Sequence, residues 1–381
     1  MLAFRATLIA EFLSTYLLPL AFVADISNAA SISSGLGGIA PTEDVPRISS
    51  TEPAAGDYII SQSPVEGKSV YSTFAAAIAA IQKEPGAKTV GVFVYPGTYK
   101  EQVVFARSGA GTTIFRGYTT DPSSPAHNQV VVQNSRGVDT GAGQSNSDSA
   151  TLYSRAPGLL RLHNVDLRNV FGQTRDFASL GFAIGNNGRA SFYGCRVAGN
   201  QDTFDTNAGT SVFAYNSVVE GSVDFIWGAG AAYFLNCTIA PNLKGGYVAA
   251  MKRASASTPG GLVFDQCTVA ATAAAAAATG SVFLGRPYNQ FSRVAYVKTY
   301  LDESIAPAGW SVWSKTDPRT NGVLLGEYQN NGPGAGTSAR ASFSRQLSKA
   351  EVTQFQLANF FSSQGTAWID MTDVKMAPFS P

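Results

Sequence analysis

A short strand-like segment recurs through the middle of the chain, and this repeat constrains the fold more than any other feature. Its copies are LHNVDL, FYGCRV, FAYNSV, FLNCTI and FDQCTV, at 162–167, 192–197, 213–218, 234–239 and 264–269. Aligned on their fourth residues, at 165, 195, 216, 237 and 267, they are spaced by 30, 21, 21 and 30 residues. One such unit cannot bury its apolar face alone, whereas stacked units can. The repeat therefore predicts an all-β fold, a single-stranded right-handed parallel β-helix with short capping helices.

Composition agrees with a β-rich solenoid and excludes several partners. Only 14% of the 381 residues are charged and 38 are glycine, which suits many tight turns better than a helical bundle. The net charge of +1, without a run of lysines or arginines, predicts neither a nucleic-acid nor a membrane partner. Stacking would bring Cys237 and Cys267 about 5 Å apart on adjacent coils. Either a disulfide or two buried free thiols would fit that spacing.

The ends of the chain differ in character from the repeat. Arg5, an apolar stretch at 12–23 and small residues up to Ala30 predict a signal peptide over 1–30, and so a secreted, extracellular protein. Residues 31–67 are rich in Ser, Gly, Pro and Thr and predict a loosely structured lead-in. Residues 68–381 are then expected to form the β-helix catalytic domain.

Three segments outside the strands of the repeat predict helix or loop. Residues 72–81 (STFAAAIAAI) predict a short helix near the start of the solenoid. Residues 348–361 begin with the capping box Ser348 and Glu351 and predict a helix that packs on the outside of the solenoid. The alanine-rich stretch 271–279 lies between coils and is interpreted as a loop insert.

Three segments place charged side chains among glycine and aromatic residues: GNQDTF at 199–204, GSVDFIWG at 221–228 and LGRPY at 284–288. Asp202 follows the repeat position at 195 by seven residues and Asp224 follows 216 by eight, so the two are almost in phase on neighbouring coils. Two close carboxylates cannot both ionise cheaply, and Arg286 would keep one charged. That combination provides a general acid and an oxygen nucleophile. A turn-capping Asp202 with a purely structural Asp224–Arg286 pair is the alternative, which the presence of all three segments disfavours.

In this order the segments resemble the motifs of the pectin methylesterase (pectinesterase) family, GxQDT, GxVDFI[FW]G and LGRP[WY]. The resemblance extends to YPGTYKE at 95–101 and to the segments 309–313 and 327–334, and covers roughly 68–369. It implies an enzyme that hydrolyses the methyl esters of galacturonate residues in pectin, releasing methanol. Methyl-esterified homogalacturonan would be its partner. We expect no cofactor and no metal, and a monomer.

The resemblance also implies roles for matching residues. Asp224 would attack the ester carbonyl and form an acyl-enzyme. Asp202 would protonate the departing methanol and then act as base on the hydrolytic water. Arg286 would hold Asp224 charged and oriented, and Gln201 would help to stabilise the oxyanion.

Five further residues are expected to contact substrate. Trp227, Phe225, Phe204 and Tyr288 are candidates for an aromatic groove on which sugar rings stack, although burial in the solenoid core would suit each of them as well. Ser179 stands where the family has a second oxyanion glutamine, and its hydroxyl would reach less far.

Two other functions compete with the esterase. A pectate lyase needs clustered acidic residues for calcium, and a polygalacturonase needs several aspartates, commonly with a histidine; neither pattern is found in this sequence. A non-catalytic wall-binding solenoid would share the fold, since fold alone does not fix function. The presence of Asp202, Asp224 and Arg286 argues against it.

Overall fold

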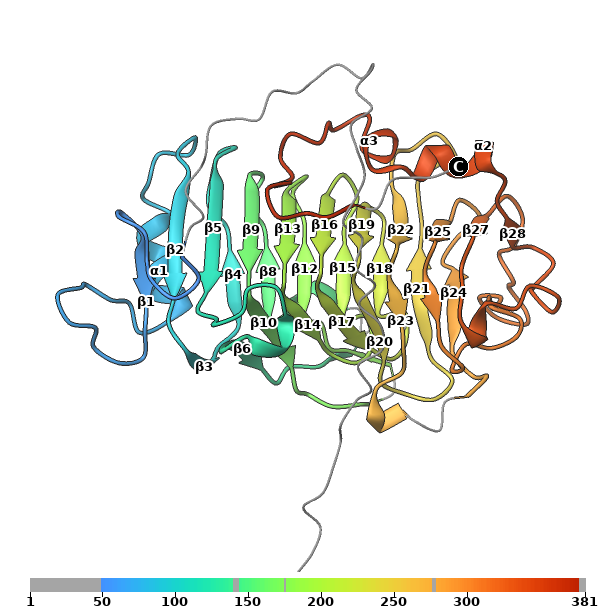
Figure 1. Ribbon diagram of the computed structural model, residues 1–381, viewed down its shortest axis with the longest axis horizontal. Helices are drawn as coiled ribbons and strands as arrows, with labels where there is room; N and C mark the ends of the chain where they lie inside the picture. Colours follow the sequence, from blue (N-terminus) through green and yellow to red (C-terminus); the bar gives the residue numbers. More distant parts are fainter. Residues whose placement is uncertain (1–48, 140–143, 175, 276–278, 377–381) are drawn as a thin grey trace, which may run out of the picture. The chain divides into compact units, whose positions relative to one another are not determined.

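The computed structural model describes residues 49–139, 144–174, 176–275 and 279–376 of the chain. In this part the chain winds through three parallel sheets, and each central coil contributes its strands in turn to sheet A, sheet B and sheet C. Figure 1 shows the strands of successive coils side by side from β1 to β28. The fold is the predicted parallel β-helix. The signal peptide expected over 1–30 lies outside the described residues.

Each sheet runs along the solenoid, with its strands in the spatial order of the coils. Sheet A contains β1 (Tyr58–Ile60), β2 (Val90–Val94), β5 (Thr112–Gly117), β9 (Leu159–His163), β13 (Arg189–Tyr193), β16 (Ser211–Tyr215), β19 (Ala231–Leu235), β22 (Gly261–Asp265), β25 (Arg293–Val297), β27 (Leu324–Tyr328) and β28 (Arg345–Gln346). Sheet B contains β3 (Gly97–Lys100), β6 (Val130–Asn134), β10 (Val165–Asn169), β14 (Arg196–Ala198), β17 (Val218–Gly221), β20 (Thr238–Pro241), β23 (Thr268–Val269) and β26 (Tyr300–Leu301). Sheet C contains β4 (Val103–Phe105), β8 (Leu152–Ser154), β12 (Phe182–Ile184), β15 (Phe204–Thr206), β18 (Ile226–Gly228), β21 (Tyr247–Met251) and β24 (Phe283–Pro287).

The corner between sheet A and sheet B corrects one detail of the repeat alignment. A residue with positive φ forms this corner in successive coils, for example Gly194, Asn216 and Asn236. Glycine and asparagine tolerate this left-handed conformation better than other residues. Asn216 therefore aligns with Gly194 and not with Cys195, and Ala214 pairs with Phe192. The third copy of the repeat is shifted by one residue from the alignment that the sequence suggested.

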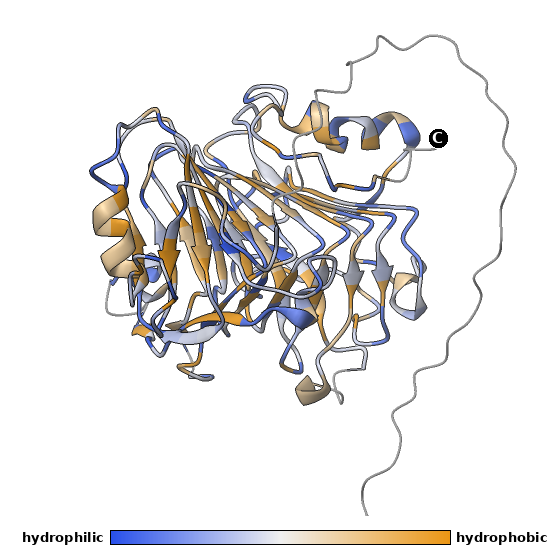
Figure 2. Ribbon diagram, turned by 60° about the vertical axis from the view of Figure 1, so that its left-hand side comes forward, coloured by the Kyte–Doolittle hydropathy of each residue, from blue (hydrophilic) through white to orange (hydrophobic). Residues whose placement is uncertain are grey.

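The core lies between the three sheets and is filled by the inward side chains of every coil. In Figure 2 hydrophobic residues concentrate in the strands and in α1, and hydrophilic residues in many of the connecting loops. Cys195, Cys237 and Cys267 are all buried in this core and all three thiols are free. Of the two arrangements that the spacing allowed for Cys237 and Cys267, the structure has the free thiols.

The N-terminal end of the solenoid is covered by α1 (Phe74–Ile81), with Thr73 as N-cap. Glu101 also caps this helix, because its carboxylate accepts hydrogen bonds from the backbone of Phe74 and Ala75 at 2.8 and 3.0 Å. The expected lead-in over 31–67 already contains strand β1, which pairs with β2. The solenoid thus begins before residue 68. The sequence did not indicate this strand, because three apolar or aromatic residues are too few to stand out in a polar segment.

The C-terminal segment packs on the outer face of sheet A, as predicted, with its apolar residues buried against Tyr233 and its neighbours. The capping box of Ser348 and Glu351 is present. The single predicted helix is instead three short pieces, α2 (Lys349–Val352), η6 (Thr353–Phe355) and α3 (Leu357–Phe360). The break has a physical reason: Phe355 and Leu357 are both buried, and residues two apart do not share a face of a helix.

Two excursions leave the coils between sheet B and sheet C. They follow β6 and β10, and they meet in a small antiparallel pair, β7 (Val138–Asp139) with β11 (Phe177–Ala178). The first also contains the 3₁₀ turn η3 (Asn146–Ser149). Besides η6, further 3₁₀ turns of the described ranges are η1 (Pro125–His127), η4 (Ala273–Ala275) and η5 (Pro333–Ala335). Within the described ranges, no helix is long and apolar enough to span a membrane.

Candidate active site

Asp202 and Asp224 lie at the same point of two consecutive coils, in the turn between sheet B and sheet C. The register of β15 with β18 pairs Phe204 with Ile226, two residues beyond each aspartate. Their backbones are therefore about 4.8 Å apart. Both have positive φ, 62° and 50°, a conformation that is uncommon outside glycine and often found at functional sites. Both are 7% exposed, so two carboxyl groups share one largely buried environment.

Arg286 pairs with Asp224 and not with Asp202. Its Nε donates to Oδ1 of Asp224 at 2.8 Å and its Nη2 to Oδ2 at 2.7 Å, a bidentate arrangement. Arg286 lies in β24, and the residue that pairs with it on the intervening strand β21 is Ala250. A methyl group at that position leaves room for the guanidinium to reach back across the coil towards Asp224.

Aromatic rings on two sides fix the guanidinium of Arg286. Its central carbon lies 4.2 Å from the ring centroid of Tyr247 and 4.4 Å from that of Trp313. Its Nη1 also donates to the backbone carbonyl of Trp313 at 3.4 Å. Such stacking on aromatic faces favours arginine over lysine at this position. The cation that faces Asp224 is thus held in one orientation.

The electrostatics of the two carboxyl groups differ. Burial raises the pKa of Asp202 well above its ordinary value, and the negative charges of Asp224 and Asp205 raise it further. Burial also raises the pKa of Asp224, but the hydrogen bonds and the charge of Arg286 oppose that rise. Asp224 is therefore the carboxyl that ionises first, and Asp202 is the one that keeps a proton.

Gln201, Trp227 and Tyr288 are each partly exposed. The indole Nε1 of Trp227 donates to the backbone carbonyl of Asp202 at 3.2 Å. The rings of Trp227 and Tyr288 are 6.5 Å apart. Gln201 directly precedes Asp202 in the sequence, and all three side chains remain accessible from solvent.

Phe204 and Phe225 were predicted as groove residues, and that prediction is wrong. They are 1% and 0% exposed and belong to the core between the sheets. In β15 and β18, Phe204 pairs with Ile226 and both face that core, so the next residues along each strand, Asp205 and Trp227, are directed away from it. Of the four aromatic candidates, only Trp227 and Tyr288 can touch a sugar ring.

Ser179 is also wrongly predicted as a substrate contact. It lies one coil before Gln201, at the expected phase, and its backbone N–H donates to the Gln201 carbonyl at 3.0 Å. Its side chain is 0% exposed, however, and the hydroxyl is buried without a hydrogen-bond partner. It faces the protein interior and cannot stabilise charge on a substrate.

Three residues near the carboxylates were not singled out from the sequence. Asn146, in η3, donates from Nδ2 to Oδ2 of Asp202 at 2.6 Å. Lys252 lies 4.7 Å from the ring centroid of Tyr288, and Arg319 lies 4.6 Å from that of Trp313. The Trp313 side chain belongs to the GWSVW segment at 309–313, which carried a family resemblance but no assigned role. Asn146 lies in a polar excursion where no spacing signal points to it.

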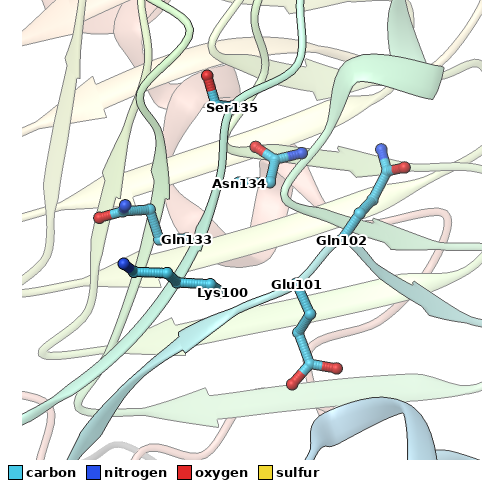
Figure 3. A pocket seen from close by; sticks show the side chains of 6 residues that line it. All are labelled: Lys100, Glu101, Gln102, Gln133, Asn134 and Ser135. Carbon is cyan, nitrogen blue, oxygen red and sulfur yellow. The ribbon is translucent and has the colours of Figure 1, made fainter.

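A separate shallow hollow of about 290 Å³ lies on the first coils of the solenoid, beside β3 and β6 (Figure 3). Figure 3 shows Glu101 pointing away from the amide side chains of Gln102 and Asn134, consistent with its role as a cap of α1. The hollow contains none of the candidate catalytic residues. In the described part of the chain, no three His, Cys, Asp or Glu side chains are grouped to hold a metal ion.

The fold and a pair of neighbouring carboxyl groups, one of them bound by Arg286, are those of a β-helical carbohydrate esterase. The family model of the pectinesterases matches residues 61–364, and the chain belongs to this family. Pectinesterase A of Emericella nidulans is 33% identical over 331 residues, 87% of this chain and 94% of that protein. The pectinesterase of Aspergillus aculeatus is 32% identical over 303 residues, 79% of this chain and 88% of that one.

Solved structures of similar fold carry the same family name. The pectin methylesterase of Aspergillus niger matches with a TM-score of 0.70 and 28% identity, covering 84% of this chain and 98% of that one. The pectin methylesterase from carrot matches in fold with a TM-score of 0.72 at 24% identity, covering 86% and 99%.

Proposed function

We propose that this protein hydrolyses the methyl esters of galacturonate residues in homogalacturonan, with Asp224 as nucleophile. The ionised Asp224 carboxylate attacks the ester carbonyl, and the tetrahedral intermediate collapses as the methoxy oxygen takes the proton of Asp202. Methanol leaves and a mixed anhydride joins Asp224 to the substrate. Asp202, now ionised, accepts a proton from water as that water attacks the substrate carbonyl. The free acid leaves, and both aspartates return to their starting states.

The unequal surroundings of the two aspartates carry this proposal. Asp224 has a bidentate cation, which favours the ionised form that a nucleophile needs. Asp202 lacks that cation and has a pKa raised well above its ordinary value, which favours the protonated form that a general acid needs. A purely structural ion pair would not require a second, neutral carboxyl at the same point of the next coil.

Gln201 supplies the oxyanion donor in this proposal. Its side chain is partly exposed beside Asp202, and no hydrogen bond from its amide to another described residue competes for the donor. Sugar rings would stack on Trp227, Tyr288 and Trp313, whose rings are in contact with one another or with Arg286. Loss of one oxyanion donor costs about 10²–10³-fold in kcat in enzymes where it has been measured.

We further propose that the protein acts outside the cell as a monomer on methyl-esterified pectin. The support for secretion is the apolar, small-residue pattern of residues 1–30. Pectin methylesterases of similar fold have been solved in complex with hexasaccharides, which supports an oligosaccharide as ligand. N-terminal sequencing of the secreted protein tests the first point, and a chain that still began with Met1 would contradict cleavage.

Product analysis on highly methylated pectin tests the reaction. We expect methanol and free carboxyl groups in equal amounts, with no new reducing ends and no unsaturated sugar. Unsaturated ends would indicate a lyase, and new reducing ends a glycoside hydrolase. Absence of all these products, with pectin still bound, would indicate the non-catalytic solenoid.

A further inference from the structure

The 3₁₀ turn η3 brings Asn146 onto Asp202. The 2.6 Å hydrogen bond from its Nδ2 ends on Oδ2 of Asp202, and within the described ranges Asn146 is the only side-chain donor to this carboxyl. Asn146 comes from the excursion after β6, 56 residues before Asp202 in sequence, and has no part in the mechanism above. Its position therefore needs an explanation of its own.

Four contacts fix the turn that carries Asn146. Ser147 Oγ donates at 2.9 Å to Oδ2 of Asp205, which lies three residues after Asp202. Ser149 Oγ donates to the backbone carbonyl of Asn146 at 2.8 Å. The Gln102 amide donates to two further backbone carbonyls of this segment, at 2.7 and 2.9 Å. A residue held from both sides in this way presents its amide at a defined place, as preorganised sites require.

The hydrogen bond distinguishes the two oxygens of the Asp202 carboxyl. Oδ2 accepts from an amide N–H, so the proton of the neutral acid belongs on Oδ1. Oδ1 is then the oxygen that can deliver a proton to a leaving group. When Asp202 is ionised, the same N–H stabilises the carboxylate and opposes the nearby charges of Asp224 and Asp205.

We propose that Asn146 is a positioning residue of the ester hydrolysis, which orients Asp202 so that Oδ1 serves as acid and then as base. This inference rests on the proposed function. It also gives the excursion after β6 a role at the site, because this excursion carries the side chain that donates to Asp202.

The pH dependence of kcat/KM for methanol release tests the proposal. In the active form Asp202 is protonated and Asp224 is ionised, so the basic limb reports loss of the Asp202 proton. Asn146→Ala removes a donor to the ionised form and should move the basic limb to higher pH by about one unit. Asp224, Asp205 and Arg286, the other charged groups that face Asp202, are unchanged in this variant. We also expect kcat to fall by about 10–100-fold, because the acid is less well oriented.

Two further variants sharpen the test. Asn146→Asp has the same shape but no N–H donor, and its added negative charge should move the basic limb further than Asn146→Ala does. Asp148→Asn changes a half-exposed carboxylate in the same turn and should leave the limb in place. A wild-type basic limb in both Asn146 variants, with the fold intact by circular dichroism, would overturn the proposal.

A double variant separates this inference from the mechanism on which it rests. If Asn146 acts through Asp202, adding Asn146→Ala to Asp202→Asn should cost less than about threefold in kcat. Full additivity would show that Asn146 acts elsewhere, while the mechanism could stand. Full activity of Asp202→Asn alone would instead contradict the proposed mechanism, whatever Asn146 does.

Discussion

Asp202 and Asp224 occupy equivalent positions on consecutive coils, yet only Asp224 forms an ion pair with Arg286. The parallel β-helix supplies the equivalence, because each coil repeats the position of the last. The guanidinium of Arg286 removes this equivalence, because it reaches only one of the two carboxyl groups, that of Asp224. Two chemically identical side chains thereby take a charged and a neutral role.

The first prediction concerns Asp202. Asp202→Asn retains the shape of the side chain but cannot donate the acidic proton, so methanol release should fall by about 10²–10⁴-fold. The basic limb of kcat/KM should also disappear, because the group that titrates there is gone. Steady-state rates across pH measure both effects. A variant with wild-type rates would exclude Asp202 as the acid.

The second prediction concerns Arg286. Arg286→Ala leaves Asp224 buried without its counter-charge, so its pKa should rise and the acid limb of kcat/KM should move to higher pH. Arg286→Lys keeps a charge but loses the bidentate geometry and much of the stacking, so a smaller shift is expected. Removing one partner of a buried pair costs about 3–5 kcal/mol of stability, so folding must be checked by thermal melting. An acid limb that stays in place in both folded variants would contradict this role.

The third prediction concerns Asp205, whose Oδ1 is buried without a partner. Burial raises the pKa of Asp205 from 3.8 to about 7 in the folded protein. Because the folded value is the higher one, the protonated group stabilises the fold below about pH 4, and this contribution is lost as pH rises towards 7.

Asp205→Asn should therefore gain stability over the wild type between about pH 4.5 and pH 8, by about 3 kcal/mol. Denaturant unfolding at the two pH values measures the difference. Asp148→Asn, at a half-exposed carboxylate, is the control for an Asp→Asn change in itself. An equal stability difference for Asp205→Asn at both pH values would disprove the shift.

The fourth prediction concerns Ser179. A glutamine there would have to fit a fully buried site, and overpacking typically costs about 1–3 kcal/mol. Ser179→Gln should lower the melting temperature without raising kcat. Ser179→Ala should be close to neutral, because the hydroxyl has no partner to lose. A faster Ser179→Gln enzyme of unchanged stability would show that the side chain reaches the substrate after all.

The solenoid and the neighbouring positions of Asp202 and Asp224 could be predicted because they depend on spacing alone. A repeat of one strand per coil fixes which residues are stacked, whatever fills the core. The one-residue shift at Asn216 was missed because apolar residues were aligned instead of the left-handed corner residue. Recognising Gly194 and Asn236 as equivalent corner positions would have placed both aspartates at the same distance after the aligned position.

Contacts across excursions could not be predicted in the same way. Asn146 reaches Asp202 through a turn whose path depends on tertiary contacts such as Ser147 with Asp205. The groove prediction for Phe204 and Phe225 failed because an apolar ring suits a groove and a core equally well. Only the positions of neighbouring strands decide between them.

The central claim is that Asp224 is the nucleophile, and methanol release by Asp224→Asn tests it most directly. The amide cannot form the mixed anhydride, while the size of the side chain and its place beside Arg286 are retained. With the fold verified by circular dichroism and thermal melting, we predict no methanol release above the uncatalysed rate from highly methylated pectin. A folded Asp224→Asn protein that releases methanol at the wild-type rate would contradict the mechanism.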